Sequence, residues 1–261
     1  MATRAQELYV YTDPASNIPA HSLVAKVSGN FTGAQLPYDR FMQRYVTELQ
    51  AGLSKNLMLK GGAVFGNVHT DQFGWEAAYL YARYRVYSKD GAHKHFRVAV
   101  FGEIAYSDNE YHFDEVNLQG DKPGLQLGIT ATQLVNRLAV SATVSHVQVL
   151  HGSRNSEIIY IPSRIYQVMN YSLSAGYLIL PVQYTDYKQT NLNIYAELLA
   201  QQGLDRSAYY VDFAPALQLI FNSNTKLNLG YRFQLGSDME RMGRNSFLVS
   251  VERTFLNALK K

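Results

Sequence analysis

The chain of 261 residues contains no cysteine, only 7 proline residues and 17% charged residues. The absence of cysteine excludes disulfides, zinc–thiolate sites and cysteine nucleophiles. No unbroken apolar run approaches the roughly 20 residues that a spanning helix requires, so any membrane crossing must be made by strands. The net charge of +3 is small and dispersed, and no basic block suggests a nucleic-acid partner.

What the chain does contain is a two-residue alternation of apolar and polar side chains. The segments 125–132 and 226–233 show it most clearly. Successive side chains of a strand point to opposite faces, so each segment has one apolar and one polar face. A soluble sandwich or barrel turns the apolar face inward, whereas a membrane barrel turns it toward lipid.

The alternation and the turn residues predict about twelve strands, each near the length that a tilted membrane strand needs. We expect them over 22–32, 43–53, 56–67, 74–87, 95–107, 124–133, 137–149, 165–179, 190–201, 208–221, 225–236 and 246–256.

The connections between these strands alternate in length. Those over 54–56, 134–136 and 222–224 are tight, whereas those over 108–123 and 151–164 are long and polar. Short periplasmic turns and longer extracellular loops are typical of outer-membrane barrels. The connections over 88–94 and 181–189 are longer than this pattern predicts.

One face of the expected strands is almost entirely aliphatic or aromatic, and we assign it outward. It comprises Leu23, Val27, Phe31, Leu49, Leu57, Leu59, Phe65, Leu80, Val98, Val100, Ile104, Leu138, Val140, Val144, Leu173, Leu192, Ile194, Leu198, Phe213, Leu217, Leu219, Phe247, Val249 and Val251.

The opposite face carries the charged residues, which we expect to line the lumen. They are Lys26, Arg44, Glu48, Lys60, Glu76, Arg83, Arg85, Arg97, Glu103, Glu197, Asp212, Arg232 and Glu252. Unpaired ionised groups in a dry core each cost several kcal/mol, so this inventory favours a water-filled lumen. A soluble sandwich with its polar face toward solvent is the alternative.

Aromatic residues gather toward the strand ends, where a membrane meets its headgroups, and predict two aromatic girdles. The residues concerned are Tyr45, Phe73, Trp75, Tyr84, Tyr87, Phe96, Tyr106, Tyr171, Tyr177, Tyr209, Phe221, Phe233 and Phe255.

The last expected strand, Ser246 to Phe255, is similar to the C-terminal strand by which Gram-negative outer-membrane β-barrel proteins are recognised for assembly; here residues 256–261 follow it. With the alternating segments and aromatic strand ends, it makes residues 22–256 resemble that family. The resemblance implies a bacterial outer-membrane location and contact with outer-membrane lipid and lipopolysaccharide. It also implies small polar solutes as cargo and other outer-membrane proteins as potential partners.

Residues 1–21 are expected to be a signal remnant followed by an N-terminal periplasmic or lumenal segment, and residues 22–261 the transmembrane barrel domain. Thr3-Arg4-Ala5 resembles the small-residue end of a secretory signal, which predicts export and removal of the signal peptide; an ordinary cytosolic start is the alternative. The segment 9–21 contains two prolines and several turn formers. We expect it to form a small plug or a loose lead-in peptide.

Catalytic and metal-binding readings have weak support, so we assign no catalytic or metal-ligating residues and expect no cofactor. One trio resembles that of outer-membrane phospholipases but falls in a polar loop: His151, Ser153 and Asn155. Two metal candidates are better explained as solvated turns: His93 and His95 near Asp90, and His112 near Asp114 and Glu115.

The fold class predicted is therefore all-β: a single transmembrane antiparallel up-and-down β-barrel of about twelve strands. About eight strands leave room only for side chains, and about 16 to 18 leave an aqueous channel, so twelve fall between. We predict a porin-like barrel that allows passive diffusion of small polar solutes, with loops 108–123 and 151–164 at its mouth. The alternatives are a non-conducting structural subunit or docking partner and an outer-membrane lipid hydrolase.

Overall fold

The computed structural model describes residues 9–34, 40–91, 94–107, 109, 113–150, 165–182, 186 and 188–260. Within that part of the chain, no helix has the length and apolar character needed to cross a membrane. The strands are β1 (Leu23–Thr32), β2 (Met42–Gly52), β3 (Leu57–Gly66), β4 (Gly74–Asp90), β5 (Lys94–Ser107), β6 (Gly124–Val135), β7 (Leu138–Val149), β8 (Gln167–Leu180), β9 (Asn191–Gly203), β10 (Tyr209–Phe221), β11 (Thr225–Ser237) and β12 (Asn245–Phe255).

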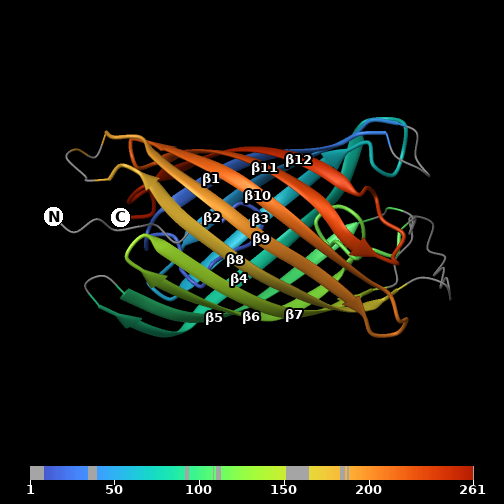
Figure 1. Cartoon of the computed structure of the whole chain (residues 1–261), viewed down its shortest axis with the longest axis horizontal. Coiled ribbons are helices and arrows are strands. Elements are labelled where there is room, and N and C mark those ends of the chain that lie inside the picture. Colours follow the sequence, from blue (N-terminus) through green and yellow to red (C-terminus); the bar gives the residue numbers. More distant parts are fainter. Residues whose placement is uncertain are drawn as a thin grey trace.

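The strands form one closed antiparallel barrel (Figure 1). Each strand pairs with its sequence neighbours, and β1 closes the sheet against β12, from Leu23 opposite Phe255 to Phe31 opposite Phe247. Closure leaves no free sheet edge, so the backbone hydrogen bonds are satisfied within the barrel. The prediction of a twelve-stranded barrel is confirmed, and the expected strand ends fall within three residues of those observed.

The outside of the barrel is apolar. Leu49, Leu80 and Leu127 are 65%, 66% and 70% exposed, and none of the residues expected to face outward is buried. A continuous aliphatic and aromatic exterior is stable against hydrocarbon rather than water. The chain is therefore a transmembrane barrel.

Connections at one end of the barrel are mostly short, and those at the other end are mostly long. The short-turn end, where β1 begins and β12 ends, lies at the left of Figure 1. The connection over 88–94 is shorter than expected because β4 and β5 continue as a hairpin to Asp90 opposite His95, with a bulge between Arg85 and Tyr87. The connection 181–190 is long for its end, and loop 151–164 lies outside the described residues.

Aromatic side chains mark both ends of the outer surface, as expected for girdles. Those near the long-loop end include Phe73, Trp75, Tyr106, Tyr171 and Tyr209, all exposed. Those near the short-turn end include Tyr84, Tyr87, Phe96, Tyr177, Phe221 and Phe255, also exposed. Tyr45 and Phe233 are partly covered by ring contacts with Phe73 and Phe213.

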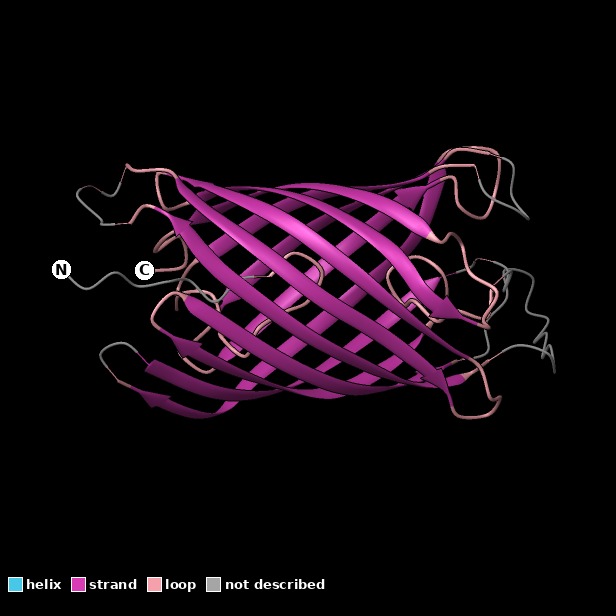
Figure 2. Ribbon diagram, in the orientation of Figure 1, coloured by secondary structure: helices cyan, strands magenta, loops and turns pink. Residues whose placement is uncertain are grey.

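Two non-strand segments occupy the inside of the barrel (Figure 2). Residues 9–20, the N-terminal segment, lie against the inner wall and lead into β1; Ala15 is fully buried and donates its backbone N–H to Thr132 Oγ1 at 2.8 Å. Residues 113–123, the inward loop, belong to the connection between β5 and β6 and enter from the long-loop end. The lumen is therefore partly filled from both ends.

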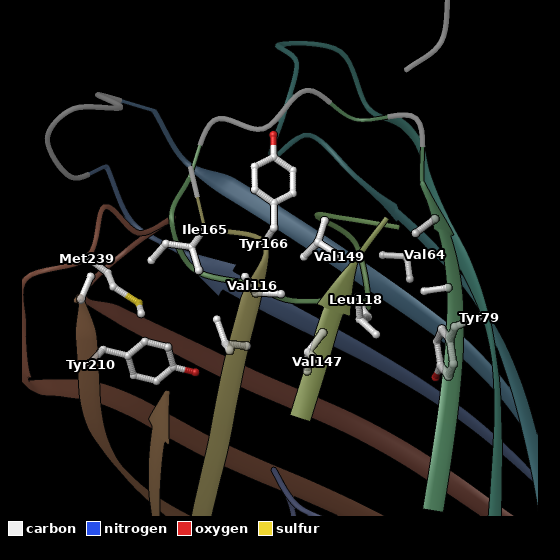
Figure 3. Close-up of a cluster of buried hydrophobic side chains, with 14 residues drawn as sticks. Val64, Tyr79, Val116, Leu118, Val147, Val149, Ile165, Tyr166, Tyr210 and Met239 are labelled. Atoms are coloured by element: carbon white, nitrogen blue, oxygen red, sulfur yellow. The ribbon is translucent and has the colours of Figure 1, made fainter. Parts of the chain in front are cut away.

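The inward loop is held by an apolar cluster inside the barrel. Val116 and Leu118 of the loop lie among inward-facing side chains of the strands, including Val147, Val149 and Tyr210 (Figure 3). The alternation of the strands turns these residues inward, and the loop covers them, which removes apolar surface from water. Gly120 has φ +136°, and a Cβ there would lie 2.5 Å from the Arg44 guanidinium carbon, so the loop requires glycine at this position.

Candidate functional site

The inner surface of the barrel has two chemically different parts. The strands β6, β7 and β8 contain no Asp, Glu, Lys or Arg, and every other strand contains at least one. We call the inner face of β6–β8 the hydroxyl wall; it presents Gln126, Gly128, Thr130, Thr132, Ser141, Thr143, Ser145, Asn170, Ser172, Ser174 and Gly176. We call the inner faces of the other strands the charged wall.

The N-terminal segment packs against the hydroxyl wall because small side chains leave room there. The Tyr9 ring meets the Tyr195 ring edge-on, with centroids 5.8 Å apart. A Cβ at Gly176 would lie 2.5 Å from the Tyr195 ring and 3.6 Å from the Tyr9 ring. Thr12 Oγ1 lies 2.8 Å from Ser174 Oγ. The small residues at these positions therefore leave the space that the N-terminal segment occupies.

One carboxylate, that of Glu197 on β9, holds the start of the segment. Its Oε1 accepts the backbone N–H of Val10 at 3.0 Å and of Tyr11 at 2.9 Å. Its Oε2 accepts the hydroxyl of Thr12 at 2.6 Å and that of Ser174 at 3.1 Å. Glu197 is fully buried, and these hydrogen bonds replace the water that its oxygens lose.

Cations of β3, β4 and β5 hold the middle of the segment. Arg83 donates to the backbone carbonyls of Pro14 at 2.8 Å and Ser16 at 2.9 Å, and to Asn17 Oδ1 at 3.1 Å. Lys60 Nζ lies 3.0 Å from Asp13 Oδ2, and Arg97 donates to Ser16 Oγ at 2.7 Å. The segment is therefore bound on both sides.

Arg44 of β2 anchors the inward loop from the charged wall. Its Nε lies 2.6 Å from Glu76 Oε2, and its second terminal nitrogen lies 2.5 Å from Asp121 Oδ1. His69 Nε2 lies 3.0 Å from the same Asp121 oxygen. Burial raises the pKa of Asp121, but the attraction of Arg44 and the contact with His69 outweigh it and hold that pKa well below its usual range.

A second ionic cluster anchors the beginning of the inward loop. Arg232 of β11 lies 2.5 Å from Asp212 and 3.2 Å from Glu115, and Arg241 lies 2.6 Å from Asp212 and 3.1 Å from Glu115. Burial raises the pKa of Glu115, but Arg241 and Arg232 lower it below its usual range. Gln201 adds two hydrogen bonds to the Val116 backbone, at 2.8 and 2.9 Å.

A cavity of about 980 Å³ runs between these two segments and the charged wall. Its lining includes Thr254 and Leu256 at the short-turn end and Gly243 and Asn245 at the long-loop end. Of the hydroxyl-wall strands, only Leu134 lines it. A second cavity of about 290 Å³ lies on the hydroxyl-wall side, and Tyr11, Asp13 and Asn117 line both.

The thirteen charged residues expected in the lumen occupy several kinds of position. Those lining the larger cavity are Lys26, Arg44, Glu48, Lys60, Arg83, Arg97, Asp212, Arg232 and Glu252, and Glu103 lines the smaller one. Glu76 and Glu197 are buried beneath their partners. Arg85 donates to Lys55 O and Asn56 Oδ1 of the β2–β3 turn, at the short-turn end.

Most of these charges are joined in ion pairs. Lys60 lies 3.5 Å from Glu48, Arg97 lies 3.0 Å from Asp90, and Lys226 pairs with Glu252. Four ion-pair partners are not among the residues expected to line the lumen, namely Lys226, Arg241, Glu115 and Asp121. Lys226 carries a usable signal because it alternates with Leu227 at an inward position of its strand; the others lie on loops, where no period exists.

The structure describes only some of the residues that were considered as catalytic or metal-binding candidates. His151, Ser153 and Asn155 lie outside the described residues, as do His93 and His112. His95 Nδ1 lies 3.0 Å from Asp90, a carboxylate that Arg97 also binds. No cluster of three or more metal-ligating side chains occurs among the residues with described positions.

Comparisons with known proteins identify the fold. No family model and no curated protein matches the sequence. An outer membrane channel from Pseudomonas putida F1 is similar in structure, with a TM-score of 0.64 and 15% identity over 95% of this chain and 100% of that chain. The NanC porin has a TM-score of 0.55 and 10% identity over 88% and 98%.

The β-domain of the Bordetella autotransporter BrkA is also similar, with a TM-score of 0.51 and 13% identity over 90% of this chain and 99% of that chain. The chain has the outer-membrane β-barrel fold. Because proteins described as a channel, a porin and an autotransporter domain share it, the function must be argued from the lumen of this chain.

Proposed function

We propose that the protein is an outer-membrane channel through which small polar solutes diffuse passively. The observation that carries this proposal is the larger cavity, because its lining reaches both ends of the barrel and is rich in charged and polar groups. A barrel whose lumen served only as packed scaffold would be closed by side chains across its width. The bacterial outer membrane is the proposed location, with lipid and lipopolysaccharide against the apolar exterior.

The proposed path follows the charged wall rather than the barrel axis. The N-terminal segment and the inward loop fill the centre, so solutes pass between them and β1, β2, β11 and β12. The path-lining role is proposed for the expected residues that face the cavity. These are Lys26, Arg44, Glu48, Lys60, Arg83, Arg97, Asp212, Arg232 and Glu252.

Planar-bilayer recording tests the proposal. The purified protein should give discrete current steps, and the boiled protein should give none. Ser28, which lines the cavity, and Val27, which is 53% exposed on the outer face, supply matched variants on one strand. Ser28→Trp should reduce the step size and Val27→Trp should leave it unchanged. Silence of the folded protein at all voltages would overturn the proposal and favour a non-conducting structural subunit.

A further inference from the structure

The inner face of β1 differs from the rest of the charged wall. Four alternate residues, Lys26, Ser28, Asn30 and Thr32, line the larger cavity from the short-turn end to the long-loop end. Among the described residues, none of their side chains has a hydrogen-bond partner or an ion-pair partner. The Asn30 Oδ1 and Thr32 Oγ1 atoms are buried without a protein partner. Buried polar groups normally find partners, so these two atoms carry unused hydrogen-bonding capacity beside the cavity.

Lys26 lies between two carboxylates that are already bound elsewhere. It stands opposite Glu252 of β12 and opposite Glu48 of β2 in the strand register. Glu252 pairs with Lys226 on its far side. The two oxygens of Glu48 accept hydrogen bonds from Gln50 at 2.6 Å and from Tyr79 at 2.5 Å. Each of these carboxylates therefore has closer partners than Lys26.

The described residues on the opposite side of the cavity offer Lys26 no ion-pair partner within contact distance. There the N-terminal segment presents backbone and neutral side chains such as Ser16 and Asn17. Its one carboxylate, Asp13, lies 3.0 Å from Lys60 and 3.8 Å from Arg83. Among the described residues, Lys26 thus has no ion-pair partner, and a charge in a narrow polar passage selects mobile ions of opposite sign.

We propose that the inner face of β1 is the solute track of the channel, that Lys26 is its selectivity-determining residue, and that small hydrophilic anions are the favoured solutes. Ser28, Asn30 and Thr32 replace part of the hydration of the solute as it moves along the strand. This inference rests on the proposed channel function and adds the sign of the solute charge to it.

The reversal potential of the channel under a potassium chloride gradient tests this inference. Wild-type protein should prefer chloride to potassium. Lys26→Gln should reduce the preference, and Lys26→Glu should reverse the sign of the reversal potential. Arg253→Gln is the matched control, because Arg253 is exposed on the outer face of β12 beside Phe255 and its loss changes the net charge equally. The control should keep the wild-type value.

A second variant changes Glu252, the carboxylate opposite Lys26 in the strand register. Glu252→Gln leaves Lys226 without its partner, adds a positive charge to the passage and should strengthen the preference for chloride. Each variant is used only after its boiled and unboiled forms differ in electrophoretic mobility, which shows a folded barrel. Conducting wild-type protein that prefers potassium, or variants that all keep the wild-type value, would overturn the inference and leave the channel standing. Silent wild-type protein would overturn both.

Discussion

The hydroxyl wall and the charged wall have the same alternation of inward and outward residues but different inward-facing side chains. The hydroxyl wall of β6–β8 presents small neutral groups that satisfy one another, as in the hydrogen bond of Thr143 to Thr130 at 2.8 Å. The charged wall presents ion pairs, and the larger cavity lies along it. Small side chains leave space that the N-terminal segment fills, whereas long charged side chains reach from their strands to the segments and bind them.

The difference between the two walls explains why one side of the lumen is filled by the N-terminal segment and the other side holds the larger cavity. Burying a neutral hydroxyl pair costs little, so the hydroxyl wall can be covered by a peptide segment. Burying a charge is costly unless it is paired or hydrogen-bonded, so most of the charged wall keeps contact with water or with a counter-charge, and Glu197 is held by backbone and hydroxyl donors. The position of the passage therefore follows from which strands carry charge.

Removing residues 9–17 should have the largest effect, because it uncovers the hydroxyl wall. The two cavities share lining residues from this segment, including Tyr11 and Asp13, so they should merge. We expect a severalfold larger single-channel conductance and a weaker chloride preference, since solutes then bypass Lys26. Planar-bilayer recording measures both quantities.

Glu197→Gln is the matched smaller change for that deletion. The amide keeps one acceptor oxygen but places an NH2 group where the other oxygen accepts Thr12 and Ser174. The loosened segment should produce brief openings above the wild-type level. Identical conductance in wild type, the deletion and Glu197→Gln would show that the segment does not limit the passage.

Arg44→Met should have the next largest effect, on stability. The Arg44, Glu76 and Asp121 side chains are 5%, 4% and 6% exposed, and removal of one partner from a buried ion pair costs about 3–5 kcal/mol. Thr130→Val on the hydroxyl wall removes a neutral hydrogen bond and should cost about 1 kcal/mol. Guanidinium unfolding in detergent, followed by the single tryptophan, compares them. Equal losses would contradict the distinction between the walls.

The strands and their faces could be predicted from sequence because the period-two pattern is local. Leu125, Leu127 and Ile129 alternate with polar residues, and no distant information is needed to place them outside. The charged residues expected to face inward follow from the same rule. The alternation does not predict the position of the Arg85 guanidinium. That position depends on the bulge beside Arg85 and on the β2–β3 turn at the strand end.

The inner segments could not be predicted in the same way. The contact of Glu197 with the backbone of Val10 joins residues that are distant in sequence, and backbone N–H groups leave no trace in a residue pattern. The inward course of residues 113–123 depends on Arg44 and on an apolar cluster of strand ends. Inward-facing Val147 and Val149 were a usable signal, since apolar residues on a polar face require a cover.

Acid should release the charged wall from the inward loop while leaving the hydroxyl wall unaffected, which is the smallest effect expected. The pKa values of Asp121 and Glu115 are lowered in the folded protein, so their contribution to stability is full above the ordinary carboxyl values near 4 and is lost as pH falls through the lower folded values. Each unit of depression corresponds to about 1.4 kcal/mol. Unfolding in detergent between pH 7 and pH 3 should show the beginning of this loss below about pH 4, and Asp121→Asn should lose less stability over that range because one of the two carboxylates is already absent.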